Sequence, residues 1–495
     1  MRKILIIGGG PAGLAAGVYA CMAGFQALVL EKHDLPGGLC TAWNRQGYTI
    51  DGCVHFIMGS GPGSSLHAMW NELGVFDHVD PLRDFHYHRD LFDYRFADGQ
   101  RLRLCTNMDA LEQTLVRLSP VDARVSRSFV RAVRALDGFS PPLDLLRGLG
   151  PVARAARRTA PYLLPLWRWK NISIGDFAAR FRSRELREAF SRLWYPDYNM
   201  LYILLIMSWL GQGLAGYPRF NSLGFSRLLE RSLLQRGGQI QYGSRVNQIL
   251  VEGGRAVGLE LESGERLYGD HVIAAAASPD TLAGLLPGHP ITRPGLPITP
   301  PLVHVVFGSS HDFGDYESAA CGLNMELDPP IELSGEARSF LLVHIYNFVD
   351  GLAPPGRVLV KAMYPSEYQR WAARRATSRE RYREAKDRAA EAVMEAMDRH
   401  FPGFSRTVEM VDVATPATFQ RYTENQLGSL IAWGAVPGAP FALDRTVPGV
   451  RNLVLAGHWI MPGGGVPQAA LSGRQAVQWI CHQERIPCDW PASEA

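Results

Sequence analysis

The sequence predicts an α/β protein in which a Rossmann-like dinucleotide-binding domain is interleaved with a mixed α+β substrate domain. Three observations support this prediction. The chain begins with a strand, a glycine-rich turn and a helix, and a second unit of the same kind follows near residue 452. Between them lie an arginine-rich region with a helical pattern and a block of strand-like segments.

The N-terminal unit has the features of a pyrophosphate-binding turn. Residues 3–7 (KILII) form a short apolar run typical of a buried parallel strand. Gly8, Gly10 and Gly13 follow with G-x-G-x-x-G spacing. The first glycine allows a tight turn, the second lets the backbone approach a pyrophosphate, and the third lets the helix pack on the strand. The helix predicted over residues 11–23 offers free N–H groups and its positive dipole end to the phosphates.

A carboxylate follows the second strand of this nucleotide-binding unit, at the position that binds the ribose. The second predicted strand, residues 27–30, ends in Glu31, which can accept hydrogen bonds from the adenosine ribose hydroxyls. The alternative interpretation is a secretory signal, since two basic residues precede an apolar stretch. Three glycines within that stretch and the acidic strand end argue against a signal.

The same glycine spacing recurs once, at Gly211, Gly213 and Gly216. These glycines follow a long apolar segment instead of a short strand, and they run into Tyr217-Pro218 instead of a helix. We interpret them as a loop.

The C-terminal unit complements the first. Residues 452–456 predict an apolar strand, residues 457–466 a glycine-rich turn, and residues 467–483 a helix. A helix N-terminus that faces an isoalloxazine ring presents partial positive charge to the N1/C2 carbonyl region, where negative charge gathers when a flavin accepts a hydride. Alone, the unit is equally compatible with an ordinary strand, turn and helix without a ligand. Beside the N-terminal unit, it indicates a flavin enzyme.

Composition limits the function classes. The chain has 495 residues, of which 46% are apolar and 20% charged, as in an ordinary globular protein of two or three domains. The net charge of +3 gives no reason to expect nucleic-acid binding. Seven cysteines without a C-x-x-C pair argue against a disulfide framework or a structural zinc site, and we expect no metal. A reducing cytoplasm is the simplest location.

Two segments bear on membrane contact, although no apolar stretch is long enough to span a bilayer. Residues 201–214 are strongly apolar, which favours a buried helix or the wall of a substrate channel over a membrane segment. Residues 147–170 mix arginine and lysine with leucine, tyrosine and tryptophan. Such a mixture suits a lipid headgroup layer as well as a solvated helix surface, so peripheral membrane contact is a hypothesis.

The order of patterns predicts a discontinuous domain organisation. Residues 1–80, 220–285 and 440–485 form the cofactor-binding domain, and residues 81–219 and 286–439 form the substrate or cap domain. From about residue 80 the pattern turns helical, and the helical part of the second domain covers about 110–219.

Several fragments together resemble a known family, the flavin-dependent phytoene desaturase, carotenoid isomerase and retinol saturase group of amine-oxidase-like oxidoreductases. The resemblance spans both ends and parts of the middle of the chain. The fragments are Gly8 to Gly13, Glu31-Lys32, Pro36-Gly37-Gly38, Asp51-Gly52-x-x-His55-Phe56, Leu352 to Gly356, Ala414 to Thr423, Gly457, and Pro462 to Pro467.

The resemblance implies an FAD-binding domain of the glutathione-reductase/amine-oxidase type and a hydrophobic substrate, often a polyene or isoprenoid, in a tunnel against the flavin face. The implied FAD contacts are Gly8, Gly10, Pro11, Ala12, Gly13, Glu31, Lys32, Gly37, Gly38, Leu39, Val246, Gly457, Pro462, Gly463, Gly464, Gly465 and Val466. The chain departs from the family pattern at residues 221–224 and 423–428, which face substrate or cofactor in the family. These departures argue against a standard carotenoid substrate.

The main functional hypothesis is desaturation of a carbon–carbon bond by hydride transfer to flavin N5. The first alternative is a saturase or a cis/trans isomerase of conjugated double bonds that works with reduced flavin. The second is a non-catalytic prenyl-lipid-binding protein of the Rab GDP-dissociation-inhibitor type, which the intact flavin motifs disfavour. An amine substrate is a further alternative. The sequence indicates neither the electron acceptor nor the oligomeric state.

His55 is the best single candidate for proton transfer or substrate orientation, because imidazole titrates near neutral pH and the resembling strand approaches the flavin. The alternative role for His55 is that of a hydrogen-bonded core residue. His458 and Trp433 are weaker candidates of the same kind.

Overall fold

The computed structural model describes residues 2–143, 149–276, 278–488 and 490. Its first sheet is parallel and has five strands, which come from three separate parts of the chain. The strand order is β10 (Gln239–Gln241), β2 (Gln26–Leu30), β1 (Lys3–Ile7), β14 (His271–Ala274) and β20 (Leu453–Leu455). The predicted strands at 3–7, 27–30 and 452–456 therefore meet in one sheet, with β1 at its centre.

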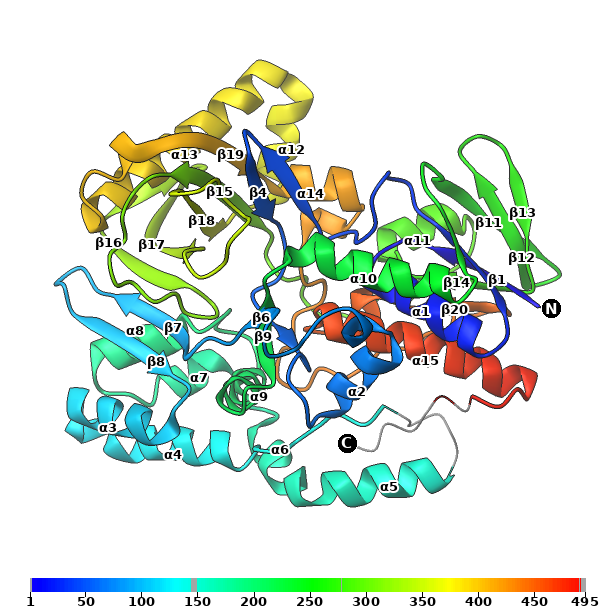
Figure 1. The fold of residues 1–495 in the computed structure, drawn as a ribbon, viewed down its shortest axis with the longest axis horizontal. Coiled ribbons are helices and arrows are strands. Elements are labelled where there is room, and N and C mark those ends of the chain that lie inside the picture. Colours follow the sequence, from blue (N-terminus) through cyan, green and yellow to red (C-terminus); the bar gives the residue numbers. More distant parts are fainter. Residues whose placement is uncertain (1, 144–148, 277, 489, 491–495) are drawn as a thin grey trace.

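Three helices pack beside one another against this sheet. They are α1 (Pro11–Met22), α10 (Asn221–Gln235) and α15 (Val466–Glu484), and Figure 1 shows α1 between the other two. The contact between α1 and α15 depends on Gly473, because a Cβ atom there would lie 2.2 Å from the carbonyl oxygen of Ala12. The helices of the two glycine-rich units are thus in direct contact.

Smaller elements extend this part of the molecule. A three-stranded antiparallel sheet, β11 (Val246–Glu252), β12 (Arg255–Leu261) and β13 (Arg266–Tyr268), lies between β10 and β14 in the chain. A hairpin before residue 52 consists of β3 (Ala42–Arg45) and β4 (Tyr48–Asp51). The remaining elements are α2 (Ser65–Glu72), α11 (Pro279–Leu285), and the small strands β5 (Ile57–Met58), β6 (Phe85–His86) and β9 (Ala215–Pro218).

A second large sheet has seven strands in the order β19 (Val408–Ala414), β15 (Leu302–Ser309), β18 (Val358–Pro365), β17 (Glu336–Ile345), β16 (Leu323–Leu333), β7 (Asp90–Arg95) and β8 (Arg101–Cys105). Helix α13 (Arg379–His400) packs against it, and α12 (Tyr368–Thr377) and α14 (Pro416–Thr423) lie nearby (Figure 1). The strands combine residues 90–105 with residues 302–414, so two distant segments of the chain share one sheet.

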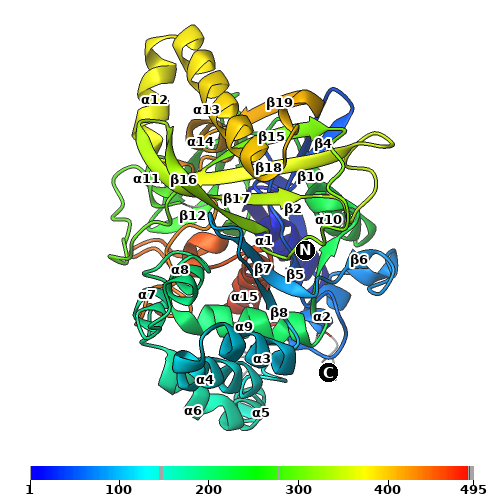
Figure 2. The ribbon, with the colours of Figure 1, turned by 90° about the vertical axis from the view of Figure 1, so that its left-hand side faces the viewer.

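A group of helices lies at the end of the molecule opposite α12 and α13, as Figure 2 shows. They are α3 (Met108–Leu118), α4 (Ala123–Arg134), α5 (Leu149–Thr159), α6 (Leu163–Trp169), α7 (Ile174–Ala178), α8 (Arg184–Ser191) and α9 (Met200–Gly211). Helix α9 corresponds to the apolar segment 201–214 and is mostly buried, as expected for a core helix. Among the described residues, no helix combines the length and apolarity needed to cross a bilayer.

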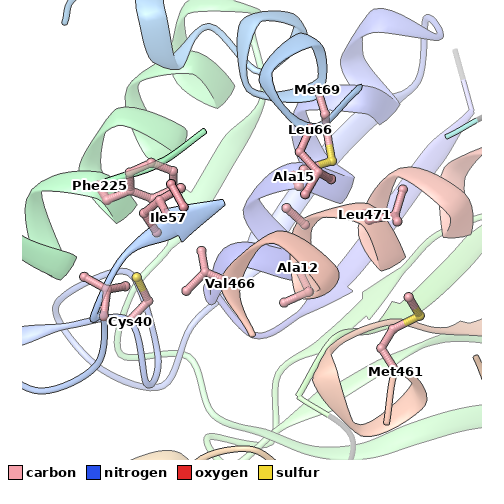
Figure 3. Close-up of a cluster of buried hydrophobic side chains, with 14 of the residues drawn as sticks. Ala12, Ala15, Cys40, Ile57, Leu66, Met69, Phe225, Met461, Val466 and Leu471 are labelled. Carbon is pink, nitrogen blue, oxygen red and sulfur yellow. The ribbon is translucent and has the colours of Figure 1, made fainter. Parts of the chain in front are cut away.

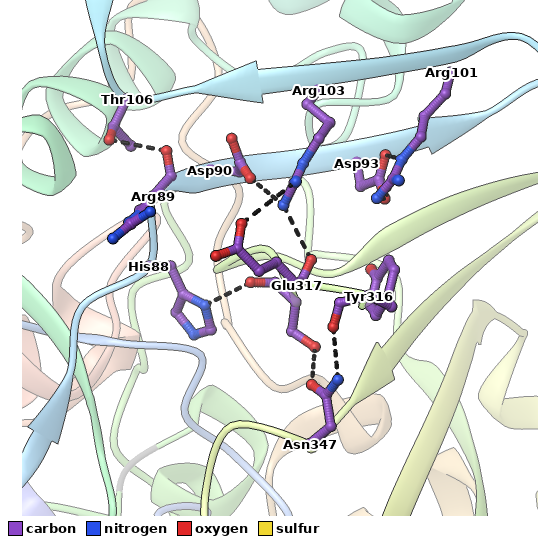
Figure 4. Close-up of polar contacts among 11 residues, drawn as sticks. His88, Arg89, Asp90, Asp93, Arg101, Arg103, Thr106, Tyr316, Glu317 and Asn347 are labelled. Atoms are coloured by element: carbon purple, nitrogen blue, oxygen red, sulfur yellow. Dashed lines mark hydrogen bonds and ion pairs between the residues drawn. The ribbon is translucent and has the colours of Figure 1, made fainter. Parts of the chain in front are cut away.

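The expectation that the pattern turns helical from residue 80 is wrong for residues 85–105, which form β6, β7 and β8. The reason is visible in Figure 4, where buried acidic residues of β7 pair with arginines of β8. Asp93 is fully buried against Arg101, and Asp90 pairs with Arg103. The two aspartates interrupt the apolar pattern by which a buried strand is recognised. Their burial is possible because arginines of the neighbouring strand β8 neutralise them, and the sequence of β7 alone does not show this.

The loop interpretation of Gly211, Gly213 and Gly216 also needs correction. Gly211 ends α9, and Gly216 lies in β9, which pairs with β5 and β6. The helical segment predicted over about 110–219 therefore ends in a strand. A Cβ atom on Gly216 would lie 2.9 Å from the ring of Tyr87, so this glycine serves close packing.

Candidate active site

A pocket opens beside the glycine turn after β1, where the two glycine-rich units meet. The space between its walls is about 1140 Å³, part of it open to solvent. The residues with the sequence-predicted cofactor role that line it are Gly8, Gly10, Pro11, Ala12, Glu31, Lys32, Gly37, Gly38, Leu39, Val246, Gly457, Gly464, Gly465 and Val466. Figure 3 shows Ala12, Cys40 and Val466 around the place where the starts of α1 and α15 approach each other.

The turn after β1 leaves backbone groups available to a ligand. Gly10 is the N-cap of α1, and no side chain caps this helix start. Its first N–H groups can therefore receive an anion. The segment of Gly37 closes over the turn, since its N–H donates to the carbonyl of Gly9 over 2.8 Å. Gly37 has a φ of 113°, and a Cβ atom there would lie 2.2 Å from the carbonyl oxygen of Cys40, so only glycine fits.

Glu31 is buried and held in place by two backbone donors. Its Oε2 accepts from the N–H of Gly9 over 2.7 Å, and its Oε1 accepts from the N–H of His33 over 3.0 Å. A carboxylate has about four lone-pair sites, so two remain for the hydroxyl groups of a ribose. The geometry therefore suits the nucleotide-binding role that the sequence predicts for this side chain.

Three predicted contact residues do not line the pocket. Gly13 faces the strand instead, because a Cβ atom there would lie 1.9 Å from the carbonyl oxygen of Gly8. Pro462 and Gly463 lie in the turn before α15. The N–H of Gly463 donates to the carbonyl of Trp433 over 2.8 Å, and a Cβ atom on Gly463 would lie 2.4 Å from the Cβ of Ala435. Gly13, Pro462 and Gly463 therefore lie behind the residues that line the pocket.

The end of α14 and the two residues after it complete the pocket. Residues 422–425 line it, and Glu424 forms ion pairs with Lys32 over 3.2 Å and with Arg245 over 2.7 Å. The imidazole Nε2 of His33 contacts the carbonyl of Tyr422 over 2.5 Å. In the sequence, residues 423–428 stand out only as a departure from a family pattern. Ser244, Arg245, Cys40 and Cys53 were missed as lining residues because nothing in their local sequence marks them.

The other departure, at residues 221–224, supports the strand end at Asp51. The carboxylate of Asp51 accepts from the N–H of Ser222 over 3.0 Å, from the hydroxyl of Tyr217 over 2.7 Å and from the N–H of Cys53 over 3.1 Å. The ammonium of Lys361 donates to the carbonyl of Asp51 over 3.0 Å. Ser222 thus fixes the segment that carries Cys53 into the pocket wall.

His55 lies beyond this wall and does not line the pocket itself. Its ring centroid is 4.4 Å from that of His344 and 6.5 Å from that of Trp194. Burial lowers the pKa of His55 to about 3, so the imidazole is neutral at pH 7. Its Nδ1 has no hydrogen-bond partner among the residues that the structure describes. A buried histidine with a purely structural role is expected to form a hydrogen bond through Nδ1. His55 forms none with the described residues, which argues against that role.

The two weaker candidates, His458 and Trp433, differ in their position relative to the pocket. His458 lines the pocket, and burial lowers its pKa to about 4. Trp433 is not a lining residue and packs edge-on against Trp459, with ring centroids 5.3 Å apart. Of the two, His458 is the one positioned to contact a bound cofactor.

Buried neutral histidines predict acid sensitivity. Burial lowers the pKa values of His55 and His88 to about 3 and that of His458 to about 4, whereas an unfolded histidine titrates near about 6.5. Below pH 6.5 the unfolded chain therefore binds more protons, and the free energy of unfolding falls until the folded-state pKa values are reached. We expect the urea midpoint to decrease from pH 7 to pH 5, and His458→Gln to reduce this slope.

The control for this experiment is His78→Gln, because His78 is exposed. Its urea midpoint should follow the same pH dependence as the parent protein. An unchanged slope in His458→Gln would show that the histidine in the pocket does not contribute to the acid sensitivity.

Comparisons with known proteins agree with this geometry. A family model described as flavin containing amine oxidoreductase matches residues 11–481. Hydroxyneurosporene desaturase of Cereibacter sphaeroides is 26% identical, with 97% of each chain covered. Prolycopene isomerase 1 of an Oncidium hybrid cultivar is 24% identical, with 95% of this chain and 82% of the relative covered. Phytoene desaturase (lycopene-forming) of Pseudescherichia vulneris is 24% identical over 96% of this chain and 98% of the relative.

Solved structures share the fold at lower identity. Cyclohexylamine oxidase from Brevibacterium oxydans superposes with a TM-score of 0.58 at 15% identity, covering 98% of this chain and 99% of that one. An oxidoreductase from Methanosarcina mazei gives a TM-score of 0.58 at 16% identity, covering 96% of this chain and all of that one. The arrangement of both sheets is therefore that of a known flavoenzyme fold.

Proposed function

Because the chain belongs to the flavin containing amine oxidoreductase family, we propose that this FAD-dependent enzyme desaturates a carbon–carbon bond of a hydrophobic polyene or isoprenoid. Similarity to desaturases named for phytoene and hydroxyneurosporene along nearly the whole chain supports the reaction class. The observation that carries the proposal is the pocket in which the starts of α1 and α15 and the fixed Glu31 carboxylate converge.

The residues present fit FAD. We assign Glu31 to the ribose hydroxyls, the uncapped start of α1 to the pyrophosphate, and the glycine turn before α15 to the flavin ring. Bound there, FAD would supply a two-electron acceptor for a hydride from the substrate. Cys53, held by the Asp51 network, forms part of the same wall. The chain's own contribution is to position the reacting bond and to exclude water.

A second candidate is a reduced-flavin isomerase or saturase of conjugated double bonds. Similarity to prolycopene isomerases, at an identity close to that of the desaturases, favours keeping it. Lipid carriage without a flavin is disfavoured, because most of the glycines that suit FAD and the carboxylate of Glu31 line the pocket.

The experiment that tests these functions starts from the visible spectrum of the purified protein, before and after denaturation. We expect a flavin spectrum and release of FAD. Polyene and isoprenoid substrates are then incubated aerobically, or anaerobically with reduced flavin. Product with two fewer hydrogens in the aerobic reaction supports the desaturase. Isomerised or hydrogenated product only with reductant supports the second candidate, and a protein unable to take up FAD contradicts both.

We further propose that α6 contacts a membrane surface from which a hydrophobic substrate is taken. Leu163, Leu164 and Trp167 expose 59%, 71% and 67% of their surface, beside basic Arg168 and Lys170. Exposed apolar side chains next to cations suit an anionic headgroup layer. The proposal narrows the hypothesis for residues 147–170 to α6; residues 147 and 148 lie outside the described residues.

Flotation with anionic liposomes tests the membrane proposal. We expect the parent protein to float and Leu164→Glu/Trp167→Glu to stay at the bottom, because two carboxylates remove apolar area and repel the lipid headgroups. Phe441→Glu is the control, since Phe441 is an apolar side chain, 63% exposed, that is not part of α6. Equal flotation of all three proteins would contradict the role of α6.

A further inference from the structure

The two faces of the seven-stranded sheet differ in polarity. Side chains alternate between the faces along each strand. Val305, Val343 and Val360 point into the apolar core under α13. The alternate positions on the same three strands point the other way and carry His304 on β15, His344 on β17 and Lys361 on β18. His344 and Lys361 are direct neighbours across the strand pair.

These polar residues are buried beside the wall of the cofactor pocket. His304, His344 and Lys361 expose at most 6% of their surface. Lys361 reaches the carbonyl of Asp51, two residues before Cys53, which lines the pocket. His55 approaches from the same segment and lies 4.4 Å from His344, ring to ring. We call His55, His304, His344, Tyr346 and Lys361 the polar roof.

The polar roof contains unused hydrogen-bonding groups. Both ring nitrogens of His304, Nε2 of His344, Nδ1 of His55 and the hydroxyl of Tyr346 lack a partner among the described residues. The ammonium of Lys361 lies 5.4 Å from the ring centroid of Tyr346. A buried polar group without a partner costs its desolvation energy. A pure hydrocarbon placed here would leave every one of these groups unsatisfied.

The charge of the polar roof indicates which ligand groups it can accept. Burial lowers the pKa values of His304 and His344 well below the usual range, so both are neutral at pH 7. Burial also lowers the pKa of Lys361, and the carboxylate of Asp51 opposes this shift; the amine of Lys361 donates hydrogen bonds in either protonation state. The nearby carboxylate of Asp51 is already engaged by Tyr217 and Ser222. An ammonium ligand would meet Lys361 without a free carboxylate to pair with, whereas an oxygen acceptor would find several donors.

We propose that the substrate is an oxygenated polyene or isoprenoid, whose carbonyl or carboxylate oxygen is bound by the polar roof beside the flavin. This inference rests on the proposed function and narrows its substrate class. Lys361 and the neutral imidazoles donate to the oxygen, while the hydrocarbon part occupies apolar surface elsewhere. The imidazoles and Tyr346 act here as specificity-determining groups, and no covalent step is required of them.

The test compares ligands of matched carbon skeleton on the FAD-loaded protein. Polyenes of 20, 30 and 40 carbons that end in a methyl, an aldehyde or a carboxylate group are titrated, and binding is followed by tryptophan quenching and by the flavin spectrum. We expect an oxygenated member to bind at least tenfold more tightly than its hydrocarbon. Equal or tighter binding of the hydrocarbon, or of a polyene amine, overturns the inference.

Variants of the polar roof test whether its residues cause the preference for oxygenated ligands. Lys361→Met and His344→Leu should abolish the preference for oxygen, and the FAD content of each variant is measured to check that the pocket wall is intact. Tyr346→Phe removes a single hydroxyl with little change in shape, so it serves if the other variants do not fold, and it should weaken only the oxygenated ligand several-fold. His78→Leu, at an exposed position, is the control. An unchanged preference in folded variants overturns the inference.

The outcomes separate this inference from the proposed function. If hydrocarbon polyenes bind equally well and are desaturated, the proposed function stands and the oxygenated substrate class is wrong. If the protein holds FAD but neither binds nor converts any polyene, both are wrong. If oxygenated ligands bind preferentially but isomerise only with reduced flavin, the inference stands and the desaturase reaction is replaced by the second candidate.

Discussion

Replacing Gly13 with alanine is expected to abolish stoichiometric FAD binding and to lower the free energy of unfolding by about 3 kcal/mol. The added Cβ atom would lie 1.9 Å from the carbonyl oxygen of Gly8, so α1 or the turn after β1 must move. Either shift displaces the helix start that we assign to the pyrophosphate. The measurement is the FAD-to-protein absorbance ratio, followed by urea unfolding.

Gly284→Ala is the matched control for this prediction. Gly284 lies on α11, two residues of which also line the pocket, and a Cβ atom there meets nothing within 4 Å. This variant should keep its FAD and gain up to about 1 kcal/mol, because alanine loses less backbone entropy on folding. Full FAD occupancy in Gly13→Ala would contradict the assigned role of the turn.

Removing the carboxylate of Glu72 should cost about 3–5 kcal/mol of stability, because it removes one member of a buried ion pair with the guanidinium of Arg474. The guanidinium Nε of Arg474 lies 3.0 Å from Oε2 of Glu72, and both side chains are almost completely buried. The hydroxyl of Tyr19 donates to the same carboxylate over 2.6 Å. This network connects α1, α2 and α15, so we expect Glu72→Ala to unfold at much lower urea concentration.

A double variant distinguishes the effect of a broken buried ion pair from the effect of lost packing at Glu72 and Arg474. Glu72→Met/Arg474→Met should be more stable than Glu72→Ala, because two apolar side chains leave no buried charge. Arg293→Ala is the control, since Arg293 and Asp280 form an ion pair in which both side chains are about half exposed; it should change stability by less than about 0.5 kcal/mol. A double variant as unstable as the single one would indicate that packing, not charge, explains the loss.

The sequence predicted the elements in which local pattern and tertiary role agree. Residues 3–7 form a buried strand, and residues 11–23 correspond to helix α1. Both are nearly continuous apolar runs, and glycine and proline mark their ends. The strands β7, β16 and β19 were missed. In β16 the strand continues through Pro329 and Pro330, and in β7 two aspartates are buried, so the alternation that marks a strand is interrupted.

For the candidate site, the glycine spacing together with its flanking strand, helix and Glu31 was enough to indicate a nucleotide. A backbone that approaches a phosphate closely leaves no room for a side chain, so glycine is required there. The required glycines lie within a few residues of one another, from Gly8 to Gly13, and can be recognised in the sequence. Glu424 shows the opposite case. It meets Lys32 and Arg245 only because three distant segments converge, and no local pattern requires a glutamate there.

The sequence by itself determined the cofactor, the family resemblance and the parallel sheet that carries the FAD-binding turn, because these depend on short segments with fixed spacing. Only the tertiary structure decided that His55, His304, His344 and Lys361 share one buried region, since they come from strands and a strand end that lie far apart in the chain. The alternation of side chains places three of them on one face of a sheet, and the fold brings that face to the pocket wall. Burial then makes unpaired polar groups informative, because a folded chain retains them at a cost unless a ligand or water completes them.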